Sequence, residues 1–149
     1  MPEKIKNIHS EIDFYHQQHT DIDIDIFNVL EKTIAAALPK AVGKVWHGHP
    51  VWFIDDNPIV GYQAKKGLVH LLFWSGQTFN EEKLIPIGKF KAAEYLITSK
   101  VDIKITDLKK WLKKSQSIQW DYKNLVKRKG VLLKIQKKVK QMKTKWLFY

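Results

Sequence analysis

The stretch from 46 to 76 limits the fold of this chain more than any other part of it. It reads WHGHPVWFIDDNPIVGYQAKKGLVHLLFWSG, in which three strand-like runs are separated by the turn-forming sequences DDNP and KKG. Short turns of this kind make successive strands antiparallel neighbours. The stretch therefore predicts a β-meander with strands over 51–54, 59–64 and 68–74.

The third strand of this meander is apolar on both of its faces. Side chains alternate along a strand, which places Val69 and Leu71 on one face and Leu68 and Leu72 on the other. Sheets with two apolar faces are usually covered on both sides. We therefore expect helices on both faces of the sheet.

A helical pattern precedes the meander. Apolar residues recur there at the spacing of one helix face, at Ile26, Val29, Leu30, Ile34 and Leu38. We expect a helix over about 25–38, with Asp23 or Asp25 as its N-cap and Pro39 at its end. The first twenty residues have a weaker pattern and predict only a short helix.

After the meander, the sequence predicts one more strand over 92–98 and a helix with Thr106 as its N-cap. The apolar stripe of this helix consists of Leu108, Trp111, Leu112 and Ile118. With 149 residues, these elements suit a single α+β domain over 1–120, in which helices pack an antiparallel meander sheet. Because cysteine is absent, disulfides, thiolate nucleophiles and cysteine-ligated metal sites are excluded.

Positive charge is concentrated near the C-terminus. Residues 104–149 hold 15 Lys and Arg against 2 Asp and Glu, whereas the preceding residues hold 11 against 13. We expect a lysine-rich helical extension over 121–149, packed on the domain or projecting from it. Its first helix would cover about 122–129 and end at Gly130, and its second would carry the apolar stripe Leu132, Ile135, Val139, Met142 and Trp146.

The basic extension suggests a polyanion as one class of partner. Lysine contacts phosphate groups without sequence specificity, which suits nucleic acid or an anionic membrane surface. The residues available for such contacts are Lys127, Arg128, Lys129, Lys134, Lys137 and Lys138. The alternative is a helix docked by its apolar stripe, with its lysines in water.

Neither a signal peptide nor a membrane-spanning segment is evident. The N-terminus has no apolar core, and no apolar run approaches the roughly 18 residues that cross a bilayer. We therefore expect a soluble, cytoplasmic protein.

Histidine and tryptophan gather in the meander, which suggests a pocket for a small ligand. Aromatic walls with a few polar groups are typical of such pockets. The residues in question are Trp46, His47, His49, Trp52, His70 and Trp74. Two alternatives remain: the same side chains can belong to the core, or His47 and His49 can contribute to a metal site together with His70 or an acidic residue.

No catalytic motif accompanies these residues. Ser75 has no nucleophile elbow around it, and neither a phosphate-binding glycine loop nor a paired-carboxylate site emerges. The sequence therefore assigns no reaction, and binding without catalysis is the preferred interpretation.

Several short motifs in the chain occur together in one known family. They are Ala37-Leu38-Pro39, Gly48-x-Pro50, the run over 57–62 (NPIVGY), the strand end over 73–76 (FWSG) and the run over 88–93 (GKFKAA). In that order they resemble the YdhG-like domain of unknown function, over about residues 20–115. The resemblance implies an α+β domain with an antiparallel sheet packed by helices.

The resemblance also implies a function. Some YdhG-like proteins are described as frataxin-like iron chaperones, which hold iron on acidic residues near the first helix. The matching positions here are Asp21, Asp23 and Asp25, with Glu31 as a further candidate. Carboxylate oxygens suit iron ions. Helix capping and solubility explain the same aspartates without a metal.

Overall fold

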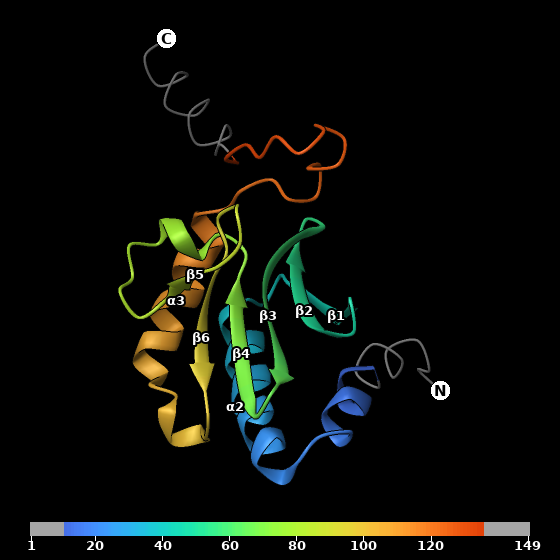
Figure 1. Cartoon of the computed structure of the whole chain (residues 1–149), viewed down its shortest axis with the longest axis vertical. Coiled ribbons are helices and arrows are strands. Elements are labelled where there is room, and N and C mark those ends of the chain that lie inside the picture. Colours follow the sequence, from blue (N-terminus) through green and yellow to red (C-terminus); the bar gives the residue numbers. More distant parts are fainter. Residues whose placement is uncertain (1–10, 136–149) are drawn as a thin grey trace.

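The computed structural model describes residues 11–135, which form an α+β fold. Their backbone builds one antiparallel sheet with the strand order β1-β2-β3-β4-β6-β5 (Figure 1). The strands are β1 (Val42–Trp46), β2 (His49–Ile54), β3 (Asn57–Lys65), β4 (Leu68–Phe73), β5 (Ile85–Pro86) and β6 (Ala93–Ile97).

The helices of the described range lie before and after the sheet in the sequence. A first helix covers residues 11–17, and it is followed by α2 (Asp21–Ala37), η1 (Gly76–Thr78), η2 (Lys100–Asp102) and α3 (Ile105–Ser117). None of the helices within 11–135 has the length and apolar character needed to cross a lipid bilayer.

The predicted meander is confirmed as β2, β3 and β4, and the strand predicted over 92–98 forms β6. The sequence pattern does not predict β1, because Gly43 and Lys44 interrupt its apolar residues. A turn at His47 and Gly48, both with positive φ (52° and 84°), joins β1 to β2. Glycine is needed at position 43, where a Cβ would lie 2.5 Å from the indole nitrogen of Trp52.

Both helices begin earlier than their apolar patterns indicate. The N-cap of α2 is Thr20, whose hydroxyl accepts a hydrogen bond from the backbone N–H of Asp23 (3.2 Å), so the prediction of Asp23 or Asp25 as the cap is wrong. Thr106 likewise lies inside the first turn of α3 rather than at its N-cap, since Lys104 occupies that position.

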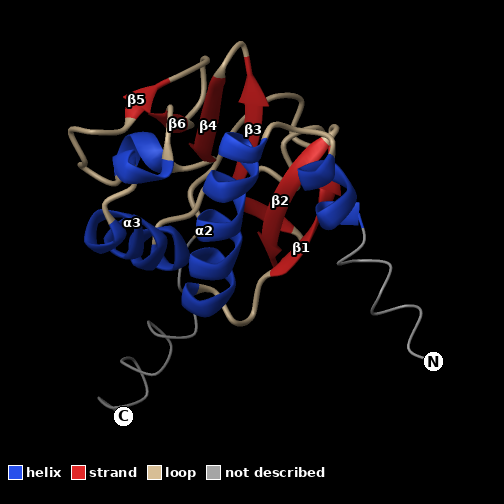
Figure 2. Cartoon of the chain, turned by 90° about the horizontal axis from the view of Figure 1, so that it is seen from below, coloured by secondary structure: helices blue, strands red, loops and turns tan. Residues whose placement is uncertain are grey.

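Both helices pack on the same face of the sheet, so the prediction that helices cover both faces is wrong (Figure 2). On α2, Phe27 stacks on Tyr62, with ring centroids 5.2 Å apart. On α3, Trp111 contacts Phe73 and Tyr95 at 6.2 Å and 5.2 Å. We call this face the covered face.

The opposite face, here called the open face, mixes apolar and polar side chains. The register between strands puts Gln63, His70, Leu72 and Glu94 on this face. Leu72 is only partly buried, whereas Tyr62, Leu71 and Phe73 on the covered face are almost entirely inaccessible to water. Because polar groups interrupt the apolar surface, no helix is required to cover it.

The C-terminal prediction is wrong within the described range. Residues 123–130 form consecutive turns instead of a helix, although Gly130 has the predicted positive φ (89°). Residues 133–135 are extended and pair with residues 119–121. In one of these contacts, the N–H of Asp121 donates a hydrogen bond to the carbonyl of Leu133 (2.8 Å). The rest of the predicted basic helix lies outside the described residues.

The start of the extension is bound to the domain through one buried side chain. The amide oxygen of Asn57 accepts hydrogen bonds from the backbone N–H groups of Tyr122 (2.9 Å) and Lys123 (3.1 Å), and its amide nitrogen donates to the carbonyl of Trp120 (3.0 Å). Asn57 is 1% exposed, so these bonds replace the water that its amide group loses on folding.

Candidate functional site

A cavity of about 220 Å³ opens on the open face of the sheet. It is lined by His49, Tyr62, Gln63, Lys65, His70, Leu72, Ile87 and Glu94. Strand pairing brings these residues together from distant parts of the sequence, since Gln63 lies opposite His70 and Leu72 lies opposite Glu94. We refer to it as the open-face cavity.

A hydrogen bond to a carboxylate fixes one of its histidines. Nδ1 of His70 lies 3.0 Å from a carboxylate oxygen of Glu94, and the side chains are only 20% and 16% exposed. A carboxylate at one ring nitrogen sets the tautomer and leaves the other nitrogen for a ligand. The carboxylate of Glu94 therefore orients the imidazole of His70 and leaves its Nε2 atom available to a ligand.

The second histidine of the cavity, His49, has an unsatisfied polar atom. Its Nδ1 atom is buried and makes no hydrogen bond within residues 11–135. Burial lowers the pKa of His49, and the nearby backbone of Pro50 and Tyr62 opposes this shift only in part. The imidazole is thus neutral at pH 7, and its Nδ1 atom keeps an unused capacity for one hydrogen bond.

The six residues of the predicted pocket are distributed over three places. His49 and His70 converge on the open-face cavity, whereas Trp46, His47 and Trp74 line a separate hollow of about 600 Å³ beside residues 122–126. Trp52 lies in the core of the covered face, with its ring 5.6 Å from that of Tyr62. The structure therefore brings the predicted residues together in two separate groups, His49 with His70 and Trp46 with His47 and Trp74, rather than in one pocket.

The three aspartates predicted to bind iron do not converge. They occupy positions i, i+2 and i+4 of α2, and this spacing turns Asp23 away from the side that Asp21 and Asp25 share. Within the described residues they belong to no group of three side chains close enough to hold one ion. These aspartates do not fit an iron site of their own.

A different group of three side chains does converge. Ligand atoms of Asp13, His16 and Glu31 all lie within 4.8 Å of one another. Asp13 and His16 are three positions apart in the helix over 11–17, which places them on one side of it, and Glu31 faces them from α2. Sequence reasoning missed Asp13 and His16, although the spacing Asp-x-x-His in a helix was the available signal.

Burial and hydrogen bonding prepare His16 for a ligand. The side chain is 5% exposed, and Nε2 lies 2.7 Å from the hydroxyl oxygen of Tyr62. Burial lowers the pKa of His16, and the nearby Asp13 only partly counteracts this shift. The neutral imidazole that results is the form that binds metal ions.

The basic residues predicted to bind a polyanion are only partly described. Lys127, Lys129 and Lys134 are exposed, whereas Arg128 donates a hydrogen bond to the carboxylate of Asp121 (2.8 Å). Lys137 and Lys138 lie outside the described residues. Polyanion binding by this region stays a prediction.

Comparisons with known proteins give no family. No family model, no curated protein and no solved structure matches the chain. The resemblance to YdhG-like domains therefore remains a prediction based on the quoted motifs.

Proposed function

We propose that this protein binds a divalent transition-metal ion through Asp13, His16 and Glu31. The observation that supports the proposal is the convergence of one imidazole and two carboxylates from two helices within 4.8 Å. Fe(II) is the ion that the resemblance to iron chaperones suggests.

The electrostatics of the cluster favour a cation. Two carboxylates face a neutral imidazole, and both of them contribute to the raised pKa of the Tyr62 hydroxyl, although burial is the larger cause. A divalent ion between them would neutralise this concentration of negative charge. The Tyr62 hydroxyl, 2.7 Å from His16, would serve as the outer partner that holds the ring in place.

The donor set indicates a labile site rather than a structural one. Oxygen and imidazole donors suit Fe(II), Mn(II), Co(II) and Zn(II), and three protein ligands leave coordination positions for water or another molecule. Asp13 is exposed, so an ion can reach the cluster from solvent. Binding with ready exchange is what delivery or storage of a metal requires.

An anaerobic titration with Fe(II), repeated with Zn(II), tests the proposal. Trp52 contacts Tyr62, which bonds to His16, so tryptophan fluorescence should change saturably along with the calorimetric heat. Replacing both carboxylates, as Asp13→Asn with Glu31→Gln, should weaken binding at least about tenfold, since even outer partners of metal ligands are worth that much.

Asp23→Asn with Asp25→Asn is the matched control, because it also removes two negative charges from the protein and does so without touching the cluster. This control should bind as the parent does. Equal losses in the two double variants, or no saturable heat in the parent, would contradict the proposal.

A second candidate function is the binding of a small polar molecule in the open-face cavity. The observation that favours it is the convergence of His49 and His70 on one cavity, with the Nδ1 atom of His49 buried and unpaired. At about 220 Å³ the cavity is smaller than most drug-sized sites and suits only a compact ligand.

The test is a set of small polar compounds added to ¹⁵N-labelled protein. Saturable shifts of the NMR signals of both imidazoles, which are lost in His49→Leu, would support this function. The absence of shifts at both imidazoles would contradict it.

A further inference from the structure

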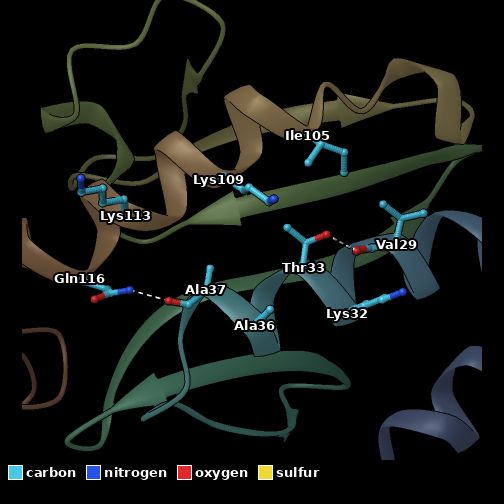
Figure 3. A pocket seen from close by; sticks show the side chains of 9 residues that line it. All are labelled: Val29, Lys32, Thr33, Ala36, Ala37, Ile105, Lys109, Lys113 and Gln116. Carbon is cyan, nitrogen blue, oxygen red and sulfur yellow. Dashed lines mark hydrogen bonds between the residues drawn. The ribbon is translucent and has the colours of Figure 1, made fainter.

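A groove of about 690 Å³ lies between α2 and α3. Figure 3 shows both helices running in the same sense along it, with Ile105 near the end marked by Val29 and Gln116 near Ala37. The side-chain amide of Gln116 donates to the carbonyl of Ala37 (2.6 Å) and closes that end. The volume lies within the range of small-molecule sites.

The floor of the groove is apolar and shallow. It consists of Val29, Ala36 and Ala37 of α2, with Ile105 of α3 at one end. Ile105 is 40% exposed, and Ala36 is exposed although it faces the partner helix. Because alanine side chains are small, they leave the space between the two helices unfilled. A linear apolar group would therefore find an unoccupied surface there.

The rim of the groove is positively charged. Lys32, Lys109 and Lys113 line it, and Lys109 extends over the gap between the helices (Figure 3). No carboxylate lines the groove, and none of these lysines forms a salt bridge with another described residue. By contrast, Lys110 and Lys114, which do not line the groove, both pair with Glu81. The groove therefore collects unneutralised positive charge around an apolar floor.

We infer that the groove binds a free medium-chain carboxylate, with its alkyl chain on the alanine floor and its head group among the lysines. The stretch of α2 from Val29 to Ala37 rises about 12 Å, which is the length of an extended chain of about ten carbon atoms. This site is separate from the metal cluster, because Glu31 does not line it.

Decanoate, below its micelle concentration, is the probe for this inference. In ¹H–¹⁵N spectra it should shift the amides of Thr33, Ala36, Ala37 and Lys109, and calorimetry should give one saturable site. Hexanoate should bind at least about tenfold more weakly, because each buried methylene contributes a factor of about four in affinity. Decanol should also bind at least about tenfold more weakly, since it lacks the charge that the lysines recognise.

Two variants test the groove itself. Lys109→Glu with Lys113→Glu should weaken decanoate binding at least about tenfold, whereas Lys66→Glu with Lys127→Glu, an equal charge change at exposed positions elsewhere, should leave it unchanged. Ala36→Trp fills the floor from an exposed position and should abolish binding while the circular dichroism spectrum is kept.

Equal affinity for decanol and decanoate would overturn the inference, as would amide shifts centred outside the groove or unaltered binding in Ala36→Trp. Binding to anionic vesicles without binding to free decanoate would also overturn it, since a lipid surface would then be the partner. Fe(II) titration of Ala36→Trp separates the two proposals, because the metal cluster is intact in that variant.

Discussion

His16 is buried and His49 is partly buried, and they lie on opposite faces of one sheet. His16, on the covered face, shares its surroundings with two carboxylates that approach from different helices. His49, on the open face, shares its cavity with His70, whose carboxylate partner Glu94 is already engaged in an ion pair. Among the described residues, only the first arrangement brings three metal-ligand side chains together.

The difference shows that neighbours, rather than the histidine itself, determine the chemistry of each site. On the covered face, helix packing brings side chains from separate elements to one point, with the buried ring of Tyr62 behind them. On the open face, side chains stand in rows set by strand register, as where His70 of β4 bonds to Glu94 of β6. Helices that pack on a sheet can therefore bring several metal-ligand side chains to one point more readily than strands within the sheet can.

The largest expected effect concerns the packing of the covered face. Tyr62→Ala should lower the free energy of unfolding by about 3–5 kcal/mol, as do other truncations of large buried aromatic residues. Leu72→Ala on the open face should cost at most about 1–2 kcal/mol, because Leu72 is only partly buried. Urea denaturation of the two variants measures the contrast, and similar losses would mean that the faces are not packed differently.

A smaller effect is expected from acidification. Burial lowers the pKa of both His16 and His49 below the ordinary value of 6.5, so the unfolded chain takes up protons on these residues before the folded chain does. Stability should thus be constant above about pH 7 and should fall as the pH drops below 6.5 towards the folded-state pKa values.

Urea titrations between about pH 8 and pH 5 measure this slope. His49→Gln should remove the contribution of the open face, and the remaining slope belongs to His16 and to any other group that titrates there. An unchanged slope in His49→Gln would show that burial does not perturb His49.

The smallest effect is expected from the ion pair of the open face. Glu94→Gln should lower stability by only about 0.5–1 kcal/mol, because His70 and Glu94 are both partly hydrated. Thermal melting at low and high salt measures it. A loss of several kcal/mol would mean that the pair is structural rather than positioned for a ligand.

The sequence predicts the fold better than it predicts the site. Alternation and turn residues are local signals, so β2, β3 and β4 follow from them directly. The sequence does not single out Thr20 as the cap of α2, because aspartates follow it at once, and it does not indicate β1, because the apolar residues of Val42–Trp46 have no clear period. The predicted C-terminal helix is absent from the described range, where residues 123–130 form turns and residues 133–135 pair with 119–121, a long-range arrangement that no local pattern indicates.

The candidate sites depend on which elements meet, and local pattern does not contain that information. Asp13 and His16 occupy a weakly amphipathic segment, and nothing near them in the sequence indicates that Glu31 faces them across two helices. Likewise, His49 and His70 are found together only because β2, β3 and β4 pair in the observed register. The spacing Asp-x-x-His was the one local indication of a site.

Paramagnetic broadening by Mn(II) is the measurement that tests the central claim most directly. Amide signals of ¹⁵N-labelled protein near a bound Mn(II) ion disappear first, which locates the ion without a crystal. We predict that broadening begins at residues 13–16 and around Glu31, and that Asp13→Asn with Glu31→Gln removes it. Broadening centred on residues 21–25, or on His49 and His70, would contradict the account.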